Sequence, residues 1–248
     1  GRTRLRGRVD SRDHTERMLP RFGAGIDVSA NEIAIDGGQH LRGIFIEIPG
    51  DPSSAAFWIA AALITPDSEI ELRDVCLNPT RTGFIDVLQR MGARIQTQLR
   101  RREPEPVGTI HVCSSDLRAI ELDERDVPSL IDELPLLAVL ATQADGVTIV
   151  RGADELRVKE SDRIDAIAAA LRAMGVRVET FDDGFAIAGP QPLHGAVIES
   201  YGDHRIAMAA AIAALQARGQ TLIRDAQCVG VSYPGFFATL QELGGEVQ

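Results

Sequence analysis

The stretch HRIAMAAAIAALQA, residues 204–217, is apolar on nearly every side once its first two residues are passed. A helix with this composition offers no polar face to water, so it is expected to lie inside a core. The stretches SSAAFWIAAALI, residues 53–64, and LPLLAVLATQA, residues 134–144, have the same character. The sequence therefore predicts three helices buried together in one core.

A repeated strand pattern surrounds these helices. The pattern G-x-T-x-x-R-[GD] occurs in GRTRLRG (1–7), GVTIVRG (146–152) and GQTLIRD (219–225), and more loosely in SEIELRD (68–74). Each copy alternates like a short β-strand and is followed by an amphipathic helix. These helices stop at Gly23, Gly92, Gly175 and Gly244, as glycine C-caps do. The predicted unit is a buried helix, a strand, an amphipathic helix and a strand.

The first copy of this unit lacks its buried helix, because the chain begins inside the repeat at Gly1. We therefore expect the chain to be the C-terminal part of a longer protein. A degenerate terminal cap is the alternative, since repeat proteins use such caps. The close match of the first strand and helix to the other copies favours truncation.

The bulk composition excludes several classes of protein. The net charge of -10 over 248 residues gives no overall basic footprint for nucleic acid or for an anionic membrane. The longest apolar run, residues 55–64, is about half of what a membrane span needs. Cys76, Cys113 and Cys228 lie far apart, which argues against a disulfide framework or a zinc site and fits a reducing cytoplasm.

Charged residues gather in the loops that follow two of the repeated strands. The loop after the first strand carries Ser11, Arg12 and His14, and the loop after the 146–152 strand carries Lys159, Glu160 and Arg163. Both loops precede a helix, whose free N–H groups favour anions. The alternative is plain capping, with Ser11 or Ser161 at the N-cap and the cations in solvent. Recurrence at equivalent loops favours a shared anion site.

A second set of charges stands at the start of the buried helices. Asp51, Asp132 and Asp203 each precede or begin one of them. Capping or structural ion pairing between repeats explains Asp51 and Asp203. Neither explains Arg205, which enters an apolar helix and must pair with an acid or a ligand. Asp132, in a mostly apolar setting, is expected to have a raised pKa and to serve as a base.

Seven ordered motifs together resemble one enzyme family. They are SRDHTERML, GDPSSAAFWIAAAL, RTGFIDVLQRMGA, IDELPLLAVLA, ELRVKESDRI, GDHRIAMA and SYPGF. They are similar to 5-enolpyruvylshikimate-3-phosphate synthase, also called 3-phosphoshikimate 1-carboxyvinyltransferase, over essentially the whole chain. The resemblance implies an α/β (α+β) fold, an inside-out α/β barrel of repeated units with buried central helices. It implies that residues 1–47 are the last, incomplete repeat of an N-terminal lobe and residues 48–248 a C-terminal lobe of three repeats.

The resemblance also implies a reaction. The family transfers the enolpyruvyl group of phosphoenolpyruvate to the 5-hydroxyl of shikimate 3-phosphate and releases phosphate, in aromatic amino acid biosynthesis. It implies two small-molecule substrates and no metal or organic cofactor, and a monomer as the full-length protein. Nucleic acid and membrane are not expected as partners. Because half of the cleft would be missing, we expect the chain alone to be inactive or nearly so.

By the same resemblance, the acceptor site falls on the first loop and the second buried helix. Ser11, Arg12 and His14 are expected to face the phosphate of shikimate 3-phosphate. Asp132 is expected to contact the ring hydroxyls and to act as the catalytic base.

The donor site falls on the second loop and the third buried helix. Lys159 and Glu160 are expected to handle proton transfer at the enolpyruvyl carbon and departure of phosphate. Arg163 and Arg205 are expected to hold phosphoenolpyruvate. Val231 stands where some family members have a lysine, which leaves one phosphoenolpyruvate contact unassigned.

Two other functions stay open at this point. The chain could be a non-catalytic repeat scaffold of the same fold, and Lys159, Glu160, Arg163 and Arg205 would then be paired off within the structure. It could also belong to an enolpyruvyl transferase with another acceptor.

Overall fold

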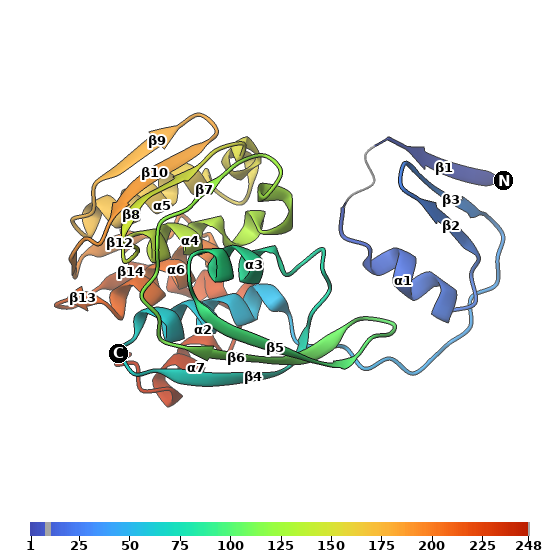
Figure 1. The fold of residues 1–248 in the computed structure, drawn as a ribbon, viewed down its shortest axis with the longest axis horizontal. Helices are drawn as coiled ribbons and strands as arrows, with labels where there is room; N and C mark the ends of the chain where they lie inside the picture. The colour runs from blue at the N-terminus through green and yellow to red at the C-terminus, as the bar shows by residue number, and fades with distance from the viewer. Residues whose placement is uncertain (8–10, 248) are drawn as a thin grey trace.

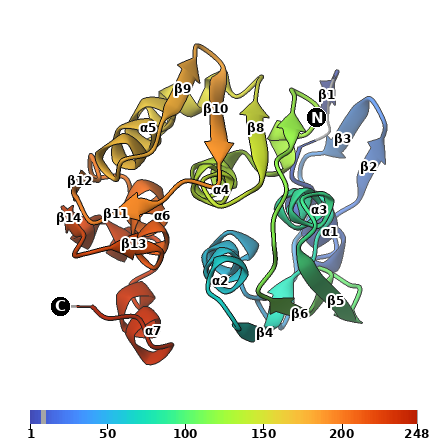
Figure 2. The ribbon, with the colours of Figure 1, turned by 60° about the vertical axis from the view of Figure 1, so that its left-hand side comes forward.

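The three buried helices form the centre of the molecule, as the sequence predicts. The computed structural model describes residues 1–7 and 11–247. Its buried helices are α2 (Pro52–Ile64), α4 (Leu134–Ala141) and α6 (His204–Ala214), and each contacts the other two. Figure 2 looks nearly along α2 and α4, with sheets and further helices around them. Every residue of α4 is buried, which explains why no polar face is found in its sequence.

Sheets wall this helical core. One sheet has the order β4-β6-β5 and a second the order β7-β8-β10-β9, and two parallel pairs, β11-β13 and β12-β14, complete the wall. The strand bounds of the first sheet are β4 (Glu69–Cys76), β5 (Arg94–Arg101) and β6 (Val107–Cys113). Those of the second are β7 (Glu121–Leu122), β8 (Gly146–Val150), β9 (Val178–Phe181) and β10 (Gly184–Gly189). The parallel pairs are β11 (Leu193–His194), β12 (Val197–Glu199), β13 (Ala217–Arg218) and β14 (Leu222–Arg224).

The amphipathic helices end where the glycines predict. They are α1 (His14–Arg21), α3 (Gly83–Arg90), α5 (Arg163–Ala173) and α7 (Phe236–Glu242). Gly23, Gly92, Gly175 and Gly244 follow them with φ of +89°, +91°, +91° and +99°. This left-handed backbone closes a helix at little steric cost only when the residue lacks a Cβ.

In the part of the chain that the structure describes, four 3-10 helices lie in the loops between these elements. Their bounds are η1 (Val127–Ser129), η2 (Ile131–Glu133), η3 (Asp154–Val158) and η4 (Ala226–Val231). The stretch ELRVKESDRI is thus mostly η3 and a turn, and α5 begins only at Arg163. The sequence predicts a loop before a helix here, and the structure adds a separate 3-10 turn within that loop.

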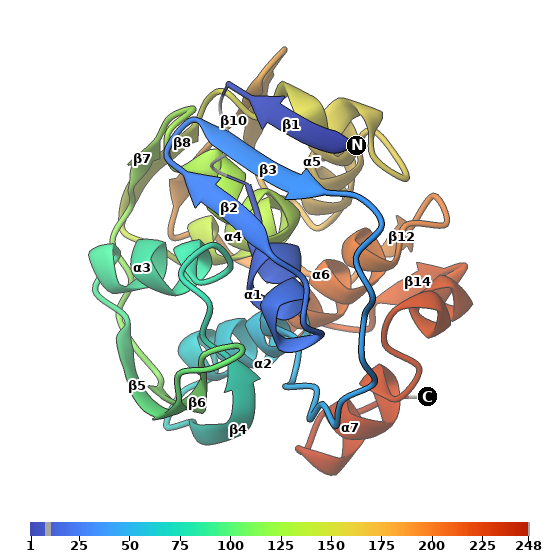
Figure 3. The same cartoon turned by 90° about the vertical axis from the view of Figure 1, so that its right-hand side faces the viewer.

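The first unit of the chain lies beside the rest. It consists of β1 (Arg2–Arg6), α1, β2 (Ile26–Ser29) and β3 (Glu32–Asp36), in an antiparallel sheet of order β1-β3-β2. In Figure 1 this unit stands at the right, and in Figure 3 it lies in front of the other elements. Residues 39–49 carry no helix or strand up to a bridge at Gly50 and connect it to α2. The apolar core cluster begins only at Ala55, so this unit adds nothing to that cluster.

Candidate active site

The N-termini of the buried helices carry the acids that the sequence singled out. The Asp51 carboxylate accepts hydrogen bonds from the backbone N–H groups of Ser53 (3.2 Å) and Ser54 (3.0 Å) at the start of α2. The Asp203 carboxylate accepts one from the N–H of Arg205 (2.9 Å) at the start of α6. These two residues are N-caps, as expected.

Neither Ser11 nor Ser161 is the N-cap of the helix that follows it. The N-cap of α5 is Asp162, which accepts from the N–H of Asp165 (3.1 Å), while Ser161 donates its hydroxyl to Asp203 (2.9 Å). The residue before α1 is Asp13, and Ser11 lies outside the helix. The capping alternative for Ser11 and Ser161 is therefore wrong.

A single carboxylate, that of Asp132 in η2, meets three arginines, which come from the loop before α1, from α5 and from α6. The Oδ2 atom of Asp132 lies 2.7 Å from Nη2 of Arg12, and its Oδ1 atom lies 3.4 Å from Nη1 of Arg163. Nη2 of Arg205 lies 3.7 Å from Oδ2. We call these four residues the Asp132 cluster. The structure thus brings together the expected base and three of the expected anion-binding cations.

Arg163 is held most tightly of the three. Its side chain is 1 % exposed and its Nε donates to Oδ2 of Asp203 (2.8 Å), whose own side chain is 0 % exposed. Nη2 of Arg163 donates to Glu160 (2.6 Å) and to Oδ1 of Asp203 (3.3 Å). A buried guanidinium with this many carboxylate partners is electrostatically satisfied.

Arg205 is paired with acids, as its entry into an apolar helix required. Its Nη1 donates to the backbone oxygen of Asp132 (3.2 Å) and to Oε1 of Glu133 (3.4 Å). The same Glu133 atom accepts from the hydroxyl of Ser53 (2.5 Å), which in turn accepts from Nη2 of Arg81 (2.8 Å). A chain of polar contacts therefore joins the N-termini of α2, α4 and α6.

The pKa values of two adjacent carboxyls move apart. Burial alone would raise the pKa of Asp132, but the charge of Arg205 and the hydrogen bond from Arg12 lower it below the ordinary value. The expectation that Asp132 has a raised pKa is wrong, because its surroundings are cationic rather than apolar. Burial does raise the pKa of Glu133, and the charge of Arg205 only partly opposes this. The pKa values of these neighbouring carboxyl groups thus differ because their charged and hydrogen-bonding partners differ.

The remaining predicted residues lie around the Asp132 cluster. Lys159 forms an ion pair with Glu155, and its charge contributes to lowering the pKa of Asp132. Ser11 is exposed and directly precedes Arg12. His14 lies on another contact, with its Nδ1 atom 2.7 Å from Oε1 of Glu105.

Sequence reasoning missed Arg81 and undervalued Glu133. Arg81 lies in the loop before α3, and it also forms an ion pair with Asp51 (2.9 Å). This loop is equivalent to those that carry Arg12 and Lys159 in the other repeats, so extending the repeat alignment to it would have found Arg81. Glu133 follows Asp132 directly, and only its burial sets it apart, which sequence does not show.

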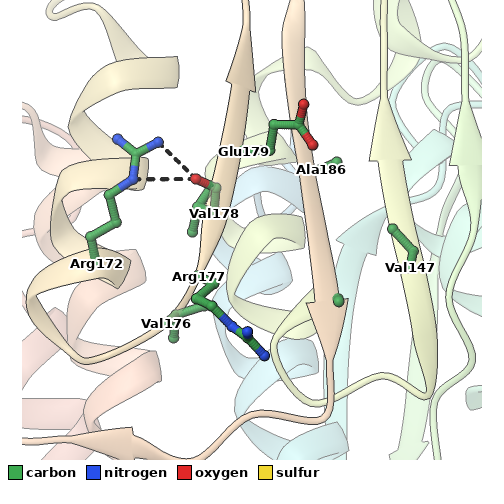
Figure 4. A pocket seen from close by; sticks show the side chains of 8 residues that line it. Val147, Arg172, Val176, Arg177, Val178, Glu179 and Ala186 are labelled. Carbon is green, nitrogen blue, oxygen red and sulfur yellow. Dashed lines mark hydrogen bonds between the residues drawn. The ribbon is translucent and has the colours of Figure 1, made fainter.

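An open hollow of about 530 Å³ lies on the outer face of the second sheet and is not part of this site. Figure 4 shows its lining: Arg172 donates to the backbone oxygen of Val178 (3.3 and 2.8 Å) on one side, and Val147 lies on the other side. Arg172 lies near the C-terminal end of α5, whereas Arg163 begins it. Arg172 comes nine positions after Arg163, which places the hollow about 14 Å along the helix from the cluster.

The described residues form neither a metal-binding cluster nor a membrane-spanning helix. Within residues 1–7 and 11–247, no group of three or more His, Cys, Asp or Glu side chains is arranged to hold a metal ion. All three cysteines are free thiols. None of the helices in the described part of the chain has both the length and the apolar character needed to cross a bilayer.

Solved structures define the class of fold. EPSP synthase from Acinetobacter baumannii superposes with a TM-score of 0.92 at 40 % identity, covering 98 % of this chain and 56 % of that one. The enolpyruvyl transferase NikO from Streptomyces tendae superposes with a TM-score of 0.82 at 23 % identity, which shows likeness of fold alone. The chain therefore has the enolpyruvyl transferase fold, and the fold class expected from the sequence is confirmed.

The family follows from the sequence comparisons. The family model described as EPSP synthase (3-phosphoshikimate 1-carboxyvinyltransferase) matches residues 1–240, and the chain belongs to that family. The protein named 3-phosphoshikimate 1-carboxyvinyltransferase from Synechococcus sp. (strain JA-3-3Ab) is 51 % identical over 246 residues, 98 % of this chain and 55 % of the relative. The protein of the same name from Geobacillus thermodenitrificans is 51 % identical over 236 residues, 94 % of this chain and 55 % of the relative. The chain spans about half the length of the curated relatives it matches.

Proposed function

We propose that the chain forms part of an enzyme that transfers the enolpyruvyl group of phosphoenolpyruvate to the 5-hydroxyl of shikimate 3-phosphate and releases phosphate. The observation that carries this proposal is the Asp132 cluster, in which guanidinium groups from three separate segments of the chain meet at one carboxylate. Arginine suits carboxylate and phosphate groups because its planar fork matches them. Membership of the EPSP synthase family supports the choice of substrates.

The reaction requires an acid, a base and clamps for anions. The 5-hydroxyl oxygen bonds to C2 of phosphoenolpyruvate and gives up its proton, while C3 takes a proton and becomes a methyl group. The bond between C2 and the phosphate oxygen then breaks, phosphate leaves, and the methyl group loses a proton to restore the double bond. We assign the hydroxyl proton to Asp132 and the proton transfers at C3 to Lys159 and Glu160. Positioning and electrostatic stabilisation supply the rest.

The lowered pKa of Asp132 fits this role once substrate enters. In the structure Arg12 and Arg205 lower that pKa. Anionic substrates that engage these arginines would neutralise part of their charge. The pKa of Asp132 would then rise towards the range in which a carboxylate accepts a proton more readily.

We propose that phosphoenolpyruvate lies on Arg163 and Arg205, and that the phosphate of the acceptor lies on Ser11, Arg12 and His14. For His14 we propose the Nε2 atom, because Nδ1 is engaged by Glu105. This assignment of roles rests on the family resemblance and stays a prediction.

We also propose that residues 1–47 and 48–248 belong to two different lobes, with the Asp132 cluster at their junction. The contact between Arg12 and Asp132 supports this position of the cluster at the junction, since it links the first unit to η2. Activity would then need the part of the relatives' length that this chain does not span.

An assay of two proteins tests the proposed function. The 248-residue chain alone is expected to show little or no turnover of both substrates. The chain joined to the part of the Synechococcus relative that it does not span is expected to turn over. Full activity of the chain alone would contradict the lobe proposal, and a folded joined protein without activity would contradict the enzyme assignment.

The acid–base role of Glu160 gives a sharper test in the joined protein. Glu160→Gln should lower turnover by about two to four orders of magnitude, because the amide cannot give or take a proton. Its contact with Arg163 can persist through the amide oxygen, which separates proton transfer from positioning. The matched control is Glu179→Gln in β9, which should keep the wild-type rate. A wild-type rate for Glu160→Gln would reassign this residue to ion pairing.

A non-catalytic scaffold remains a second candidate, because one observation favours it. Glu160, Arg163 and Arg205 are paired within the structure, and Lys159 is paired with Glu155, as a scaffold requires. Calorimetry of the joined protein with shikimate 3-phosphate separates the candidates. Binding that is lost in Arg12→Gln supports the enzyme, and a flat titration supports the scaffold. A panel of other acceptors tests whether the enolpyruvyl group goes elsewhere.

We further propose that the protein works as a monomer in the cytoplasm. Three free cysteines, one of them buried, suit a reducing compartment. Sedimentation of the joined protein would test the monomer, and a concentration-dependent dimer would contradict it.

A further inference from the structure

Three consecutive residues before and at the start of α1 reach three different points on the larger part of the molecule. Arg12 contacts Asp132 (2.7 Å). Asp13 accepts a hydrogen bond from Nδ2 of Asn78 (2.6 Å), and His14 meets Glu105 (2.7 Å). A segment held at three successive side chains has little freedom to slide, so the last two contacts bear directly on where Arg12 lies.

Asn78 and Glu105, which both belong to residues 48–248, form a socket that receives the first unit. Asn78 is 0 % exposed and Glu105 is 7 % exposed. Nδ2 of Asn78 donates to Oε2 of Glu105 (3.0 Å), so the two loops before α3 and before β6 are joined. We call this pair the Asn78–Glu105 socket.

The orientation of the Asn78 amide is fixed by its other end. Its Oδ1 atom accepts from both the N–H and the hydroxyl of Thr80 (2.9 Å each). The NH₂ group must therefore point to the two carboxylates, of Asp13 and of Glu105. The amide of Asn78 thus accepts on one side and donates to two carboxylates on the other.

The amide of the Asn78–Glu105 socket also lies between two carboxylates, those of Asp13 and Glu105. Burial alone would raise the pKa of Asp13, but hydrogen bonds from Arg17 and Asn78 lower it, so this side chain is an anion near neutral pH. Nε of Arg17 donates to Asp13 (2.8 Å). The two carboxylates of Asp13 and Glu105 thus approach one amide, which would otherwise be a site of repulsion.

We propose that Asn78 and Glu105 are positioning residues, which seat Asp13 and His14 and thereby set Arg12 against Asp132. This inference goes beyond the proposed function, and the first of its two tests does not depend on that function. Small displacements matter here, since a misplacement of about 1 Å can cost on the order of a hundredfold in catalysis.

The first test measures distance in the full 248-residue chain. Spin labels are placed on unnatural ketone residues at the exposed positions Ala30 and Ala173, which leaves the native cysteines untouched. Asn78→Asp keeps both acceptor contacts with Thr80 but replaces the donor by a third carboxylate. The distance distribution from double electron–electron resonance should be narrow in the wild type and broad in Asn78→Asp.

The chain offers a matched control across the same junction. Glu47 pairs with Arg101 (2.6 Å), and its side chain is 73 % exposed. Glu47→Ala should leave the distribution narrow, since an exposed pair contributes little. In the double variant Asp13→Asn with Asn78→Asp, the amide at position 13 can donate to the carboxylate at position 78. The distance distribution should therefore become partly narrow again. A narrow distribution in Asn78→Asp, or a broad one in Glu47→Ala, would overturn the proposal.

Emission from Trp58, the single tryptophan, checks that each variant keeps a folded core. If Asn78→Asp does not fold, Glu105→Gln takes its place. That variant keeps the shape of the socket and removes the charge that faces His14. It should broaden the distribution to a smaller extent, and an unchanged distribution would overturn the proposal equally.

The second test uses the joined protein and rests on the proposed function. Asn78→Asp should raise KM for shikimate 3-phosphate on the order of tenfold or more, through the displaced Arg12. KM for phosphoenolpyruvate should change less than twofold, because Arg163 and Arg205 do not depend on the socket. Equal changes in both constants would assign the socket a merely structural role. A joined wild type without turnover would remove the proposed function and leave the distance test standing.

Discussion

A fully buried arginine is the most demanding single residue in this chain. Removing a guanidinium from water costs several kcal/mol, and only close carboxylates repay that cost. Arg163 has three such partners, Asp203, Glu160 and Asp132, and of these Asp203 is fully buried as well. Asp203 also caps α6 and accepts from Ser161, so one carboxylate joins the starts of α5 and α6.

Removing the charge of Asp203 should therefore be costly. Asp203→Asn removes the one fully buried anion beside Arg163 and leaves it with Glu160 and the more distant Asp132, and we expect a loss of about 3 kcal/mol in the free energy of unfolding. Urea unfolding followed by Trp58 emission measures this. The matched control is Glu199→Gln, which breaks the exposed pair with Arg224 and should cost about 0–1 kcal/mol. Equal losses in the two variants would show that burial of the pair does not matter.

The same residue predicts a pH dependence of stability. Burial alone would raise the pKa of Asp203. Arg163, the N–H of Arg205 and the hydroxyl of Ser161 outweigh burial, so the pKa lies below its ordinary value of 3.8. The stability that this group supplies is thus fully present above that ordinary value and is lost as the pH falls through the lower pKa of the folded state. Urea unfolding between about pH 5 and pH 2 should show a steeper loss in the wild type than in Asp203→Asn. Parallel curves would contradict the assignment.

At the residue scale, sequence predicted the need for a partner better than it predicted the partner. Arg205 had to meet an acid, because a lone buried cation is too costly, and it meets Glu133 and Asp132. The pKa of Asp132 could not be predicted, since it depends on Arg12, which is distant in the sequence.

Among the elements, the strongly periodic ones were predictable. The three buried helices and the four glycine-terminated helices are where the sequence predicts them, because apolar spacing and C-cap glycine act locally. The two-residue strands β11 and β13 could not be predicted, as they exist only through pairing with each other. The turn η3 was missed for the same reason: it depends on the backbone oxygens of residues 181 and 182, which accept from Arg157.

The pairing of β8 with β10 depends on a residue without a side chain. A Cβ at Gly184 would lie 1.9 Å from the backbone oxygen of Val150, an atom of the neighbouring strand. Gly184→Ala should therefore destabilise the fold by about 1–3 kcal/mol, because the strands must move apart. The control is Gly230→Ala, where a Cβ meets nothing within 4 Å. Thermal unfolding compares the two variants, and equal Tm values would contradict the expected strand clash.

At the scale of the whole molecule, the chain is acidic, but three of its arginines lie close together at one site. The net charge is -10, yet Arg12, Arg163 and Arg205 converge on one carboxylate. Composition alone could not place this cluster, because its members come from repeats that only the fold brings together. The junction of the two proposed lobes is thus where charge, helix N-termini and buried polar contacts coincide.

The division into lobes predicts unequal stability of the two parts. The apolar core cluster contains only residues from Ala55 onwards, whereas Ala24 and Ala34 are the buried apolar residues of the described part of the first unit. A segment of 47 residues with so little buried surface is too small to fold alone. A chain of residues 48–248 should therefore unfold in one cooperative transition with nearly the wild-type Tm, measured by Trp58 emission. Residues 1–47 alone should give the circular dichroism of an unfolded chain. A large fall in Tm on removing residues 1–47 would show that the first unit belongs to the core and would contradict the division at residue 47.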